Sequence, residues 1–246
     1  MAERVAFVGI VVALGAALLS MVAYAWLGRR RDLDVVGKGG QFMVGLGDFP
    51  MHWLMWALTP VVGASRTLGL TADFYTYLGL VFGLASGPFI AAGRLELGGW
   101  AIVLCGIADA LDGRMARLTG TASDYGDFID STFDRFVEAS TFLGFGVYLR
   151  HTPWGALAAG GALAGALIVS YARARGEVLK VVCTGGLMQR GERLVLTAFA
   201  CFADPPLTGW LGLPHGTLVL WTLAVIGVTT FLTATYRTIW IAARLK

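Results

Sequence analysis

Residues 105–149 read CGIADALDGRMARLTGTASDYGDFIDSTFDRFVEASTFLGFGVYL, and this stretch decides how the chain folds. It begins and ends in apolar runs, but seven acidic residues fall within 30 positions between them: Asp109, Asp112, Asp124, Asp127, Asp130, Asp134 and Glu138. An acidic group inside an apolar helix is costly unless it meets a cation, a partner or water. The acidic cluster therefore indicates a functional site, whose setting depends on the rest of the chain.

The composition of the whole chain indicates that this setting is a membrane. Of its 246 residues, 57% are apolar and only 14% are charged, and the mean hydropathy is +0.69. A soluble fold cannot hide that much apolar surface. The formal net charge of +3 is too small to indicate a nucleic-acid partner. We therefore predict an all-α integral membrane protein that binds no nucleic acid.

Apolar stretches near the length of about 20 residues that a bilayer core requires occur seven times. The first is longer than the apolar part of a usual signal peptide and lacks a small-residue cleavage site, so it is interpreted as a retained anchor. The sixth is short and polar at its start. The predicted spans are Val5–Leu27, Phe74–Ala92, Leu97–Met115, Phe128–Leu149, Trp154–Tyr171, Leu194–Ala203 with a backward extension through Arg193, and Thr217–Ile241.

Between the first two spans, residues 47–69 mix the aromatic side chains Phe49, Trp53 and Trp56 with polar ones. This mixture favours a helix lying in the membrane interface, although an ordinary connecting loop is the alternative. The predicted organisation is an N-terminal anchor and basic linker over residues 1–46, followed by a juxtamembrane helix and a six-helix catalytic membrane domain over residues 47–246.

The basic residues predict the topology. If Arg29–Arg31 is cytoplasmic and the spans alternate, 15 of the 19 basic residues lie on the cytoplasmic side and only Arg4, Arg94 and Arg150 on the other, with Arg135 inside a span. This asymmetry follows the positive-inside rule. We expect seven spans, an external amino terminus and an active site facing the cytoplasm.

Glycines and cysteines contribute to packing in this interpretation. Gly79-x3-Gly83-x3-Gly87 and Gly161-x3-Gly165 would let helices approach closely. Cys105, Cys183 and Cys201 lie far apart without a CxxC pair, so we expect buried free thiols and neither a disulfide framework nor a zinc site.

The acidic residues form two pairs at helical spacing. Asp109 and Asp112 are three residues apart, and Asp130 and Asp134 are four apart, so each pair occupies one face of a helix. Four carboxylates in one cavity need compensating positive charge, and oxygen ligands favour Mg²⁺ or Mn²⁺ over zinc. Asp124 and Asp127 are interpreted differently, as acidic residues stabilised at a helix amino terminus.

Residues beside the two pairs indicate what the metals would act on. Gly113 and Gly126 leave room for a ligand to approach the backbone. Arg117 follows Gly113 by one helical turn, and its planar guanidinium group can donate two hydrogen bonds to a phosphate. Metal ligands, gaps at glycine and an arginine together indicate a diphosphate site.

These positions resemble, without a gap, the signature of the CDP-alcohol phosphotransferase family: Asp109-x2-Asp112-Gly113-x2-Ala116-Arg117-x8-Gly126-x3-Asp130-x3-Asp134. The resemblance implies the family's six-helix membrane domain from Phe74 onward, the juxtamembrane helix before it, and one additional N-terminal transmembrane helix. It also implies a homodimer. One departure is Thr71-Ala72-Asp73, where many members have Thr-Pro-Asn.

The resemblance further implies an activity. A CDP-linked donor, usually CDP-diacylglycerol, would transfer its phosphatidyl group to an alcohol and release CMP. Asp109, Asp112, Asp130 and Asp134 would hold two divalent cations, and Asp134 would also be the general base. The CDP part of the donor would meet Gly113, Arg117, Ser123 and Gly126.

The acceptor is predicted from a second cluster, in which four arginines stand at the ends of two helices: Arg173, Arg175, Arg190 and Arg193. Their surrounding sequence resembles the branch that makes phosphatidylinositol phosphate or archaetidylinositol phosphate, where a basic pocket receives the phosphate of inositol phosphate. Gly176 and Gly191 depart from residues common in that branch. The alternative is that these arginines only follow the positive-inside rule and meet anionic lipid headgroups.

Three functional hypotheses follow. The first is a phospholipid-synthesising enzyme that joins CDP-diacylglycerol to a phosphorylated polyol, inositol 1-phosphate. The second is the same chemistry with glycerol 3-phosphate or another alcohol. The third is a cation or proton transporter, which predicts paired inverted repeats with broken helices, whereas the acids here occupy one helical hairpin.

Overall fold

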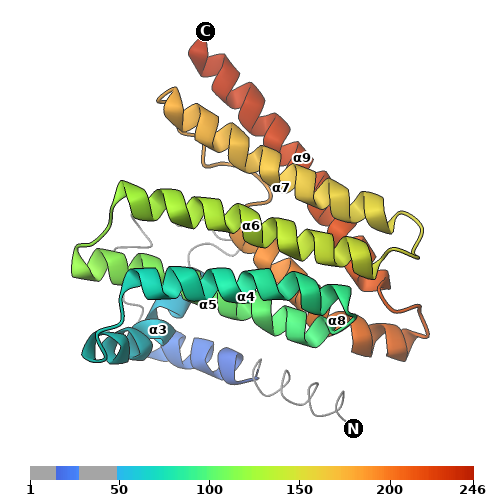
Figure 1. The fold of residues 1–246 in the computed structure, drawn as a ribbon, viewed down its shortest axis with the longest axis horizontal. Coiled ribbons are helices and arrows are strands. Elements are labelled where there is room, and N and C mark those ends of the chain that lie inside the picture. Colours follow the sequence, from blue (N-terminus) through green and yellow to red (C-terminus); the bar gives the residue numbers. More distant parts are fainter. Residues whose placement is uncertain (1–14, 28–48) are drawn as a thin grey trace. The chain divides into compact units, whose positions relative to one another are not determined.

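The computed structural model describes residues 15–27 and 49–246, and within these ranges every regular element is a helix. Gly15–Trp26 is a short apolar helix, and the part of the predicted anchor before residue 15 lies outside the described residues. The remaining helices are α3 Phe49–Thr67, α4 Ala72–Ala91, α5 Leu95–Thr119, α6 Asp124–Tyr148, α7 Gly155–Val178, α8 Arg190–Leu211 and α9 Thr217–Leu245 (Figure 1). The prediction of an all-α fold with six helices after residue 70 is confirmed.

Four of these helices, α4, α7, α8 and α9, are long and apolar enough to cross a membrane. The helix α8 is longer than predicted because it continues through Pro205 and Pro206 to Leu211. The helices α5 and α6 have 25 residues each, or about 37 Å at 1.5 Å per residue, which exceeds the hydrocarbon thickness of about 30 Å. The acidic residues that they carry lower their apolar character.

The chain packs into two compact units. The first comprises Met1–Gly79 and Gly106–Asp130, and the second comprises Leu80–Cys105 and Ser131–Lys246. In the first unit, α3 contributes Leu58 and Val62 to an apolar core that also contains Tyr75, Leu111 and Met115. The segment 49–67 is therefore a packed helix, as predicted, and not a loop.

In the second unit, α7 and α9 lie side by side, and α8 also packs on α9 (Figure 1). The core includes Ile102, Phe145, Leu223 and Ile226, and Cys201 is fully buried among them. All three cysteines are buried and free, as predicted.

Glycines bring helices of the second unit into close contact. A Cβ on Gly144 of α6 would lie 2.7 Å from the Cα of Gly87 on α4, which is closer than atoms pack. Ser86 and Thr141 join the same two helices through a hydroxyl–hydroxyl bond of 2.7 Å. The predicted role of Gly83, Gly87 and Gly165 in close packing is confirmed, since a Cβ on Gly165 would overlap the side chain of Thr230, whereas a Cβ on Gly161 would meet open space.

The start of α9 is fixed by the carboxylate of Asp204, which is fully buried. Its Oδ1 accepts from the backbone N–H of Gly216 at 2.8 Å, and its Oδ2 from those of Leu218 at 2.9 Å and Val219 at 3.2 Å. The first N–H groups of a helix lack intrahelical partners, and a carboxylate satisfies them well. Asp204 is therefore a structural residue that links α8 to α9.

Candidate functional site

In the first unit, Asp109 and Asp112 of α5 and Asp130 of α6 come together. Each offers a carboxylate oxygen, and these ligand atoms all lie within 4.8 Å of one another. Asp112 is buried, and the other two are half-buried. Three like charges this close repel strongly, and hard oxygen donors suit a divalent cation such as Mg²⁺ or Mn²⁺. The group therefore fits a metal ion.

A hydroxyl from α4 orients one of these carboxylates. Thr76 donates its Oγ1 hydrogen to Oδ2 of Asp112 at 2.9 Å. Such a bond fixes the carboxylate rotamer and leaves the other oxygen for a ligand. Thr71 helps to place Thr76, because its Oγ1 accepts from the backbone N–H of Phe74 at 3.3 Å at the start of α4.

The residues predicted to contact the CDP part of the donor lie at the end of α5 and at the start of α6. Gly113 and Arg117 stand one turn apart on α5, and a Cβ on Gly113 would lie 3.1 Å from Nη1 of Arg117. Ser123 precedes α6, where its Oγ accepts from the backbone N–H of Gly126 at 3.2 Å. Ser123 thus caps α6, and Asp124 and Asp127 occupy the first turn, where the helix dipole favours them.

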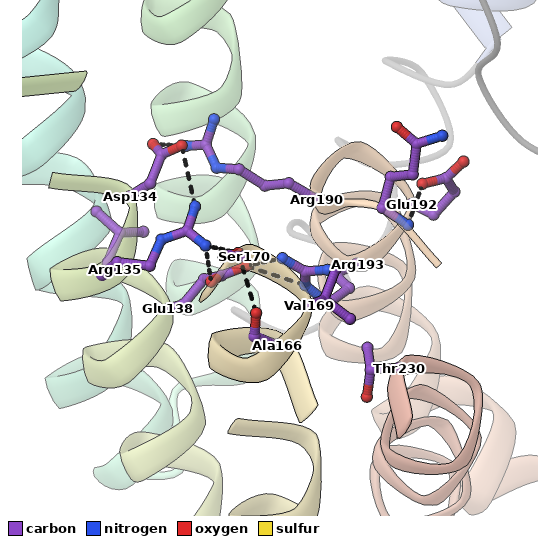
Figure 2. Close-up of polar contacts among 12 residues, drawn as sticks. Asp134, Arg135, Glu138, Ala166, Val169, Ser170, Arg190, Glu192, Arg193 and Thr230 are labelled. Carbon is purple, nitrogen blue, oxygen red and sulfur yellow. Dashed lines mark hydrogen bonds and ion pairs between the residues drawn. The ribbon is translucent and has the colours of Figure 1, made fainter. Parts of the chain in front are cut away.

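Asp134 lies in the second unit and is held by arginines. It follows Asp130 by four residues on α6, so both share one face of that helix. Its Oδ1 forms an ion pair with Arg190 of α8, and its Oδ2 is 3.5 Å from Nη2 of Arg135 (Figure 2). The predicted general base and one predicted phosphate ligand are therefore ion-pair partners in this structure.

A buried ion pair lies one turn further along α6. Glu138 accepts from Nε of Arg193 at 2.9 Å, and Nη2 of Arg193 donates to the same oxygen (Figure 2). The side chains of Arg193 and Glu138 are only 3% and 6% exposed. Nη1 of Arg135 is 3.4 Å from the other oxygen of Glu138 and also donates to Ser170 of α7. Residues of α6, α7 and α8 thus form one polar network within the second unit.

The other two predicted phosphate ligands stand at the end of α7. Arg173 pairs with Glu177 at 2.8 Å, with side chains 51% and 41% exposed, and Arg175 is also exposed. The structure therefore divides the predicted set of four arginines. Arg190 and Arg193 face carboxylates of α6, whereas Arg173 and Arg175 are accessible at the surface of the chain.

The segment that leads into α8 is anchored on α9. Thr233 accepts from the backbone N–H groups of Leu187 at 3.0 Å and Met188 at 3.1 Å. Arg237 is buried and donates through Nε to the carbonyl oxygen of Gly185 at 2.9 Å and through Nη1 to that of Val169 at 3.2 Å. These bonds fix the backbone that places Arg190 at the first turn of α8.

Sequence reasoning assigned no role to four polar contributors to these clusters: Thr76, Arg135, Glu138 and Ser170. Two of them gave a signal. Arg135 is a basic residue inside a predicted span, and Glu138 follows Asp134 by one helical turn. Thr76 and Ser170 gave none, because hydroxyls in apolar helices usually bond to their own backbone.

The sequence model of the family described as CDP-alcohol phosphatidyltransferase matches residues 69–229. The phosphatidylinositol phosphate synthase of Cutibacterium acnes is 33% identical over 152 residues, which cover 59% of this chain and 73% of that protein. The archaetidylinositol phosphate synthase of Methanothermobacter thermautotrophicus is 30% identical over 152 residues, covering 58% and 72%.

Solved structures of the phosphatidylinositol phosphate synthase of Mycobacterium tuberculosis share the fold. The structure with manganese and citrate superimposes with a TM-score of 0.66 at 26% identity, covering 74% of this chain and 88% of that one. The structure with CDP-DAG bound gives a TM-score of 0.65 at 25% identity, covering 74% and 92%.

Proposed function

Because the chain belongs to the CDP-alcohol phosphatidyltransferase family, we propose that it transfers a phosphatidyl group from CDP-diacylglycerol to inositol 1-phosphate and releases CMP. The observation that carries this proposal is the presence of two polar clusters among the helices of this apolar chain. One is a group of three carboxylates suited to a cation, and the other joins a carboxylate to arginines suited to an anionic acceptor. The relatives' activities support the choice of substrates.

Two divalent cations, Mg²⁺ or Mn²⁺, complete the donor side of this proposal. Asp109, Asp112 and Asp130 would hold them, together with Asp134 one turn further on α6. The manganese in the related synthase supports the choice of metal. When bound, such cations neutralise a diphosphate and stabilise the departing CMP.

The CDP part of the donor would lie against the end of α5 and the start of α6. Gly113 and Gly126 present backbone without a side chain, and Arg117 offers a guanidinium to a phosphate. Ser123 is exposed, and its hydroxyl can donate to the ligand while its oxygen still caps α6. The bound CDP-DAG in the related structure supports a nucleotide site in this fold.

Asp134 would act on the acceptor. Its carboxylate takes the proton of the inositol hydroxyl, and the hydroxyl oxygen then forms a bond to the phosphorus that bears the lipid. The bond from this phosphorus to the bridging oxygen breaks, and CMP leaves with that oxygen. Arg173, Arg175, Arg190 and Arg193 would bind the phosphate of the acceptor.

The protein is an integral membrane protein, as its family and the apolar helices α4, α7, α8 and α9 of the described residues indicate. We place the active site on the cytoplasmic side, since most basic residues belong there by the positive-inside rule. The proposed assembly is a homodimer in membrane lipid, with residues 1–46 as an anchor and linker and residues 47–246 as the catalytic domain.

The experiment is CMP release from CDP-diacylglycerol in liposomes containing Mg²⁺, with a panel of inositol 1-phosphate, free inositol, glycerol 3-phosphate and serine. We expect inositol 1-phosphate to be the preferred acceptor. Replacing Arg175 or Arg193 by Ala should raise the acceptor KM roughly tenfold to a hundredfold, since each charge-assisted contact is worth about 1.5 to 3 kcal/mol. The donor KM should change little.

Equal use of the other acceptors would refute the choice of inositol 1-phosphate. The arginines would then only follow the positive-inside rule. The activity would be a CDP-alcohol phosphotransfer to an unspecified acceptor. Replacing Arg150 by Ala provides the control, because this exposed arginine lies beyond the opposite end of α6. No CMP release with any acceptor of the panel would refute the phosphotransferase activity itself.

A further inference from the structure

Glu138 is an acidic residue where the proposed function requires positive charge. It lies on α6, one turn beyond Asp134, and its side chain is 6% exposed. Two arginines approach it, Arg193 from α8 and Arg135 from its own helix (Figure 2). A carboxylate beside an anion site repels the anion, so its presence there calls for another role.

The way in which Glu138 holds Arg193 indicates that purpose. Nε and Nη2 of Arg193 both donate to one oxygen of Glu138, so this edge of the guanidinium is fully used. Nη1 is buried and, among the described residues, has no hydrogen-bond partner. A buried donor without an acceptor is costly, so Nη1 of this fixed guanidinium group indicates that a ligand oxygen binds there.

We propose that Glu138 is a positioning residue for the acceptor: it fixes Arg193 by the Nε and Nη2 edge and leaves Nη1 to donate to the acceptor's phosphate. This role rests on the proposed function. A free arginine side chain loses much rotamer freedom when it binds an anion, whereas a fixed one has already lost it. Glu138 also offsets the repulsion between the guanidinium groups of Arg193 and Arg135.

In this role, Glu138 affects binding of the acceptor and not binding of the donor. The ion pairs of Glu138 are with Arg135 and Arg193, which belong to the proposed acceptor side, so we expect donor binding not to depend on Glu138. Loss of its charge should therefore raise the acceptor KM and leave the donor KM unchanged. A residue that only stabilises the fold would lower the amount of active protein and the melting temperature without this split.

The test uses the full chain in liposomes with Mg²⁺, with Glu138→Gln as the variant and Glu96→Gln, in the first turn of α5, as the matched control. We expect Glu138→Gln to raise the KM for inositol 1-phosphate at least tenfold, with the donor KM within twofold of the unmodified protein. Glu138→Asp, which keeps the charge but is shorter by one methylene, should recover part of the loss. The control should leave both constants unchanged.

An unchanged acceptor KM in Glu138→Gln, in a protein that prefers inositol 1-phosphate to free inositol, would overturn the positioning role and leave the proposed function intact. If the Gln variant does not fold, Glu138→Asp decides, since a severalfold rise in acceptor KM alone supports the role and no rise refutes it. If the unmodified protein shows no preference for the phosphorylated acceptor, the proposed acceptor and this role fail together.

Discussion

Neutralising one carboxylate of the acidic group should stabilise the metal-free protein while it abolishes activity. Asp109→Asn removes a negative charge whose carboxylate oxygen lies within 4.8 Å of those of Asp112 and Asp130. Two unit charges at this distance repel by about 3.5 kcal/mol at an effective dielectric constant of 20 and by about 0.9 kcal/mol in water. With two neighbours, the relief should amount to roughly 2 kcal/mol or more.

The assay is thermal unfolding in detergent with a chelator, followed by the same measurement with excess Mn²⁺. We expect Asp109→Asn to melt above the unmodified protein in chelator. Metal at a hundred times its dissociation constant should stabilise the unmodified protein by about 2.7 kcal/mol, and the variant much less. CMP release should fall about a thousandfold in the variant, because a lost ligand removes several kcal/mol of charge stabilisation.

Asp127→Asn is the matched control. Asp127 is exposed in the first turn of α6 and does not belong to the group of three, so the response to Mn²⁺ should persist. An equal shift with Mn²⁺ in Asp109→Asn and the unmodified protein would refute the metal site. A lower melting temperature of Asp109→Asn in chelator would refute the argument from repulsion.

Three further predictions concern the second unit. Asp134→Asn should keep CDP-diacylglycerol binding while turnover collapses, and equal loss of donor binding in Asp134→Asn and Asp112→Asn would make Asp134 a metal ligand only. Arg190→Gln should narrow the preference for inositol 1-phosphate over free inositol, because it removes a proposed phosphate ligand and also breaks the ion pair between Arg190 and Asp134; competition assays with both acceptors would measure this ratio. Gly144→Ala should lower the melting temperature by an amount corresponding to about 2 kcal/mol or more, since its Cβ would overlap the backbone of Gly87, whereas Gly146→Ala, with 3.6 Å to the nearest atom, should be tolerated.

The sequence predicts the helices well because apolar length and charge punctuation are local signals. The predicted span Phe74–Ala92 corresponds to α4, and Thr217–Ile241 lies within α9. The prediction underestimates α8, since Asp204, Pro205 and Pro206 suggest an end where the helix continues. Tertiary contacts override that local signal, because the buried carboxylate of Asp204 bonds to the start of α9.

In the candidate site, the sequence predicts which residues share a helix face but not which helices pair. Helical spacing predicts that Asp109 and Asp112 share a face, and the structure brings Asp130 to them. Spacing says nothing about pairing between distant helices, so the bonds of Arg193 to Glu138 and of Arg190 to Asp134 were not predictable. Their partners lie 55 and 56 positions apart in the sequence.

The anchoring of the segment before α8 on α9 has a consequence for protein engineering. An exchange of this segment between relatives, made to alter acceptor choice, would separate the carbonyl oxygen of Gly185 and the N–H of Leu187 from the side chains that bind them, Arg237 and Thr233. These side chains lie some 50 residues downstream, on another helix. The exchangeable module is therefore discontinuous, and a chimera must carry the matching part of α9 with the segment that it serves.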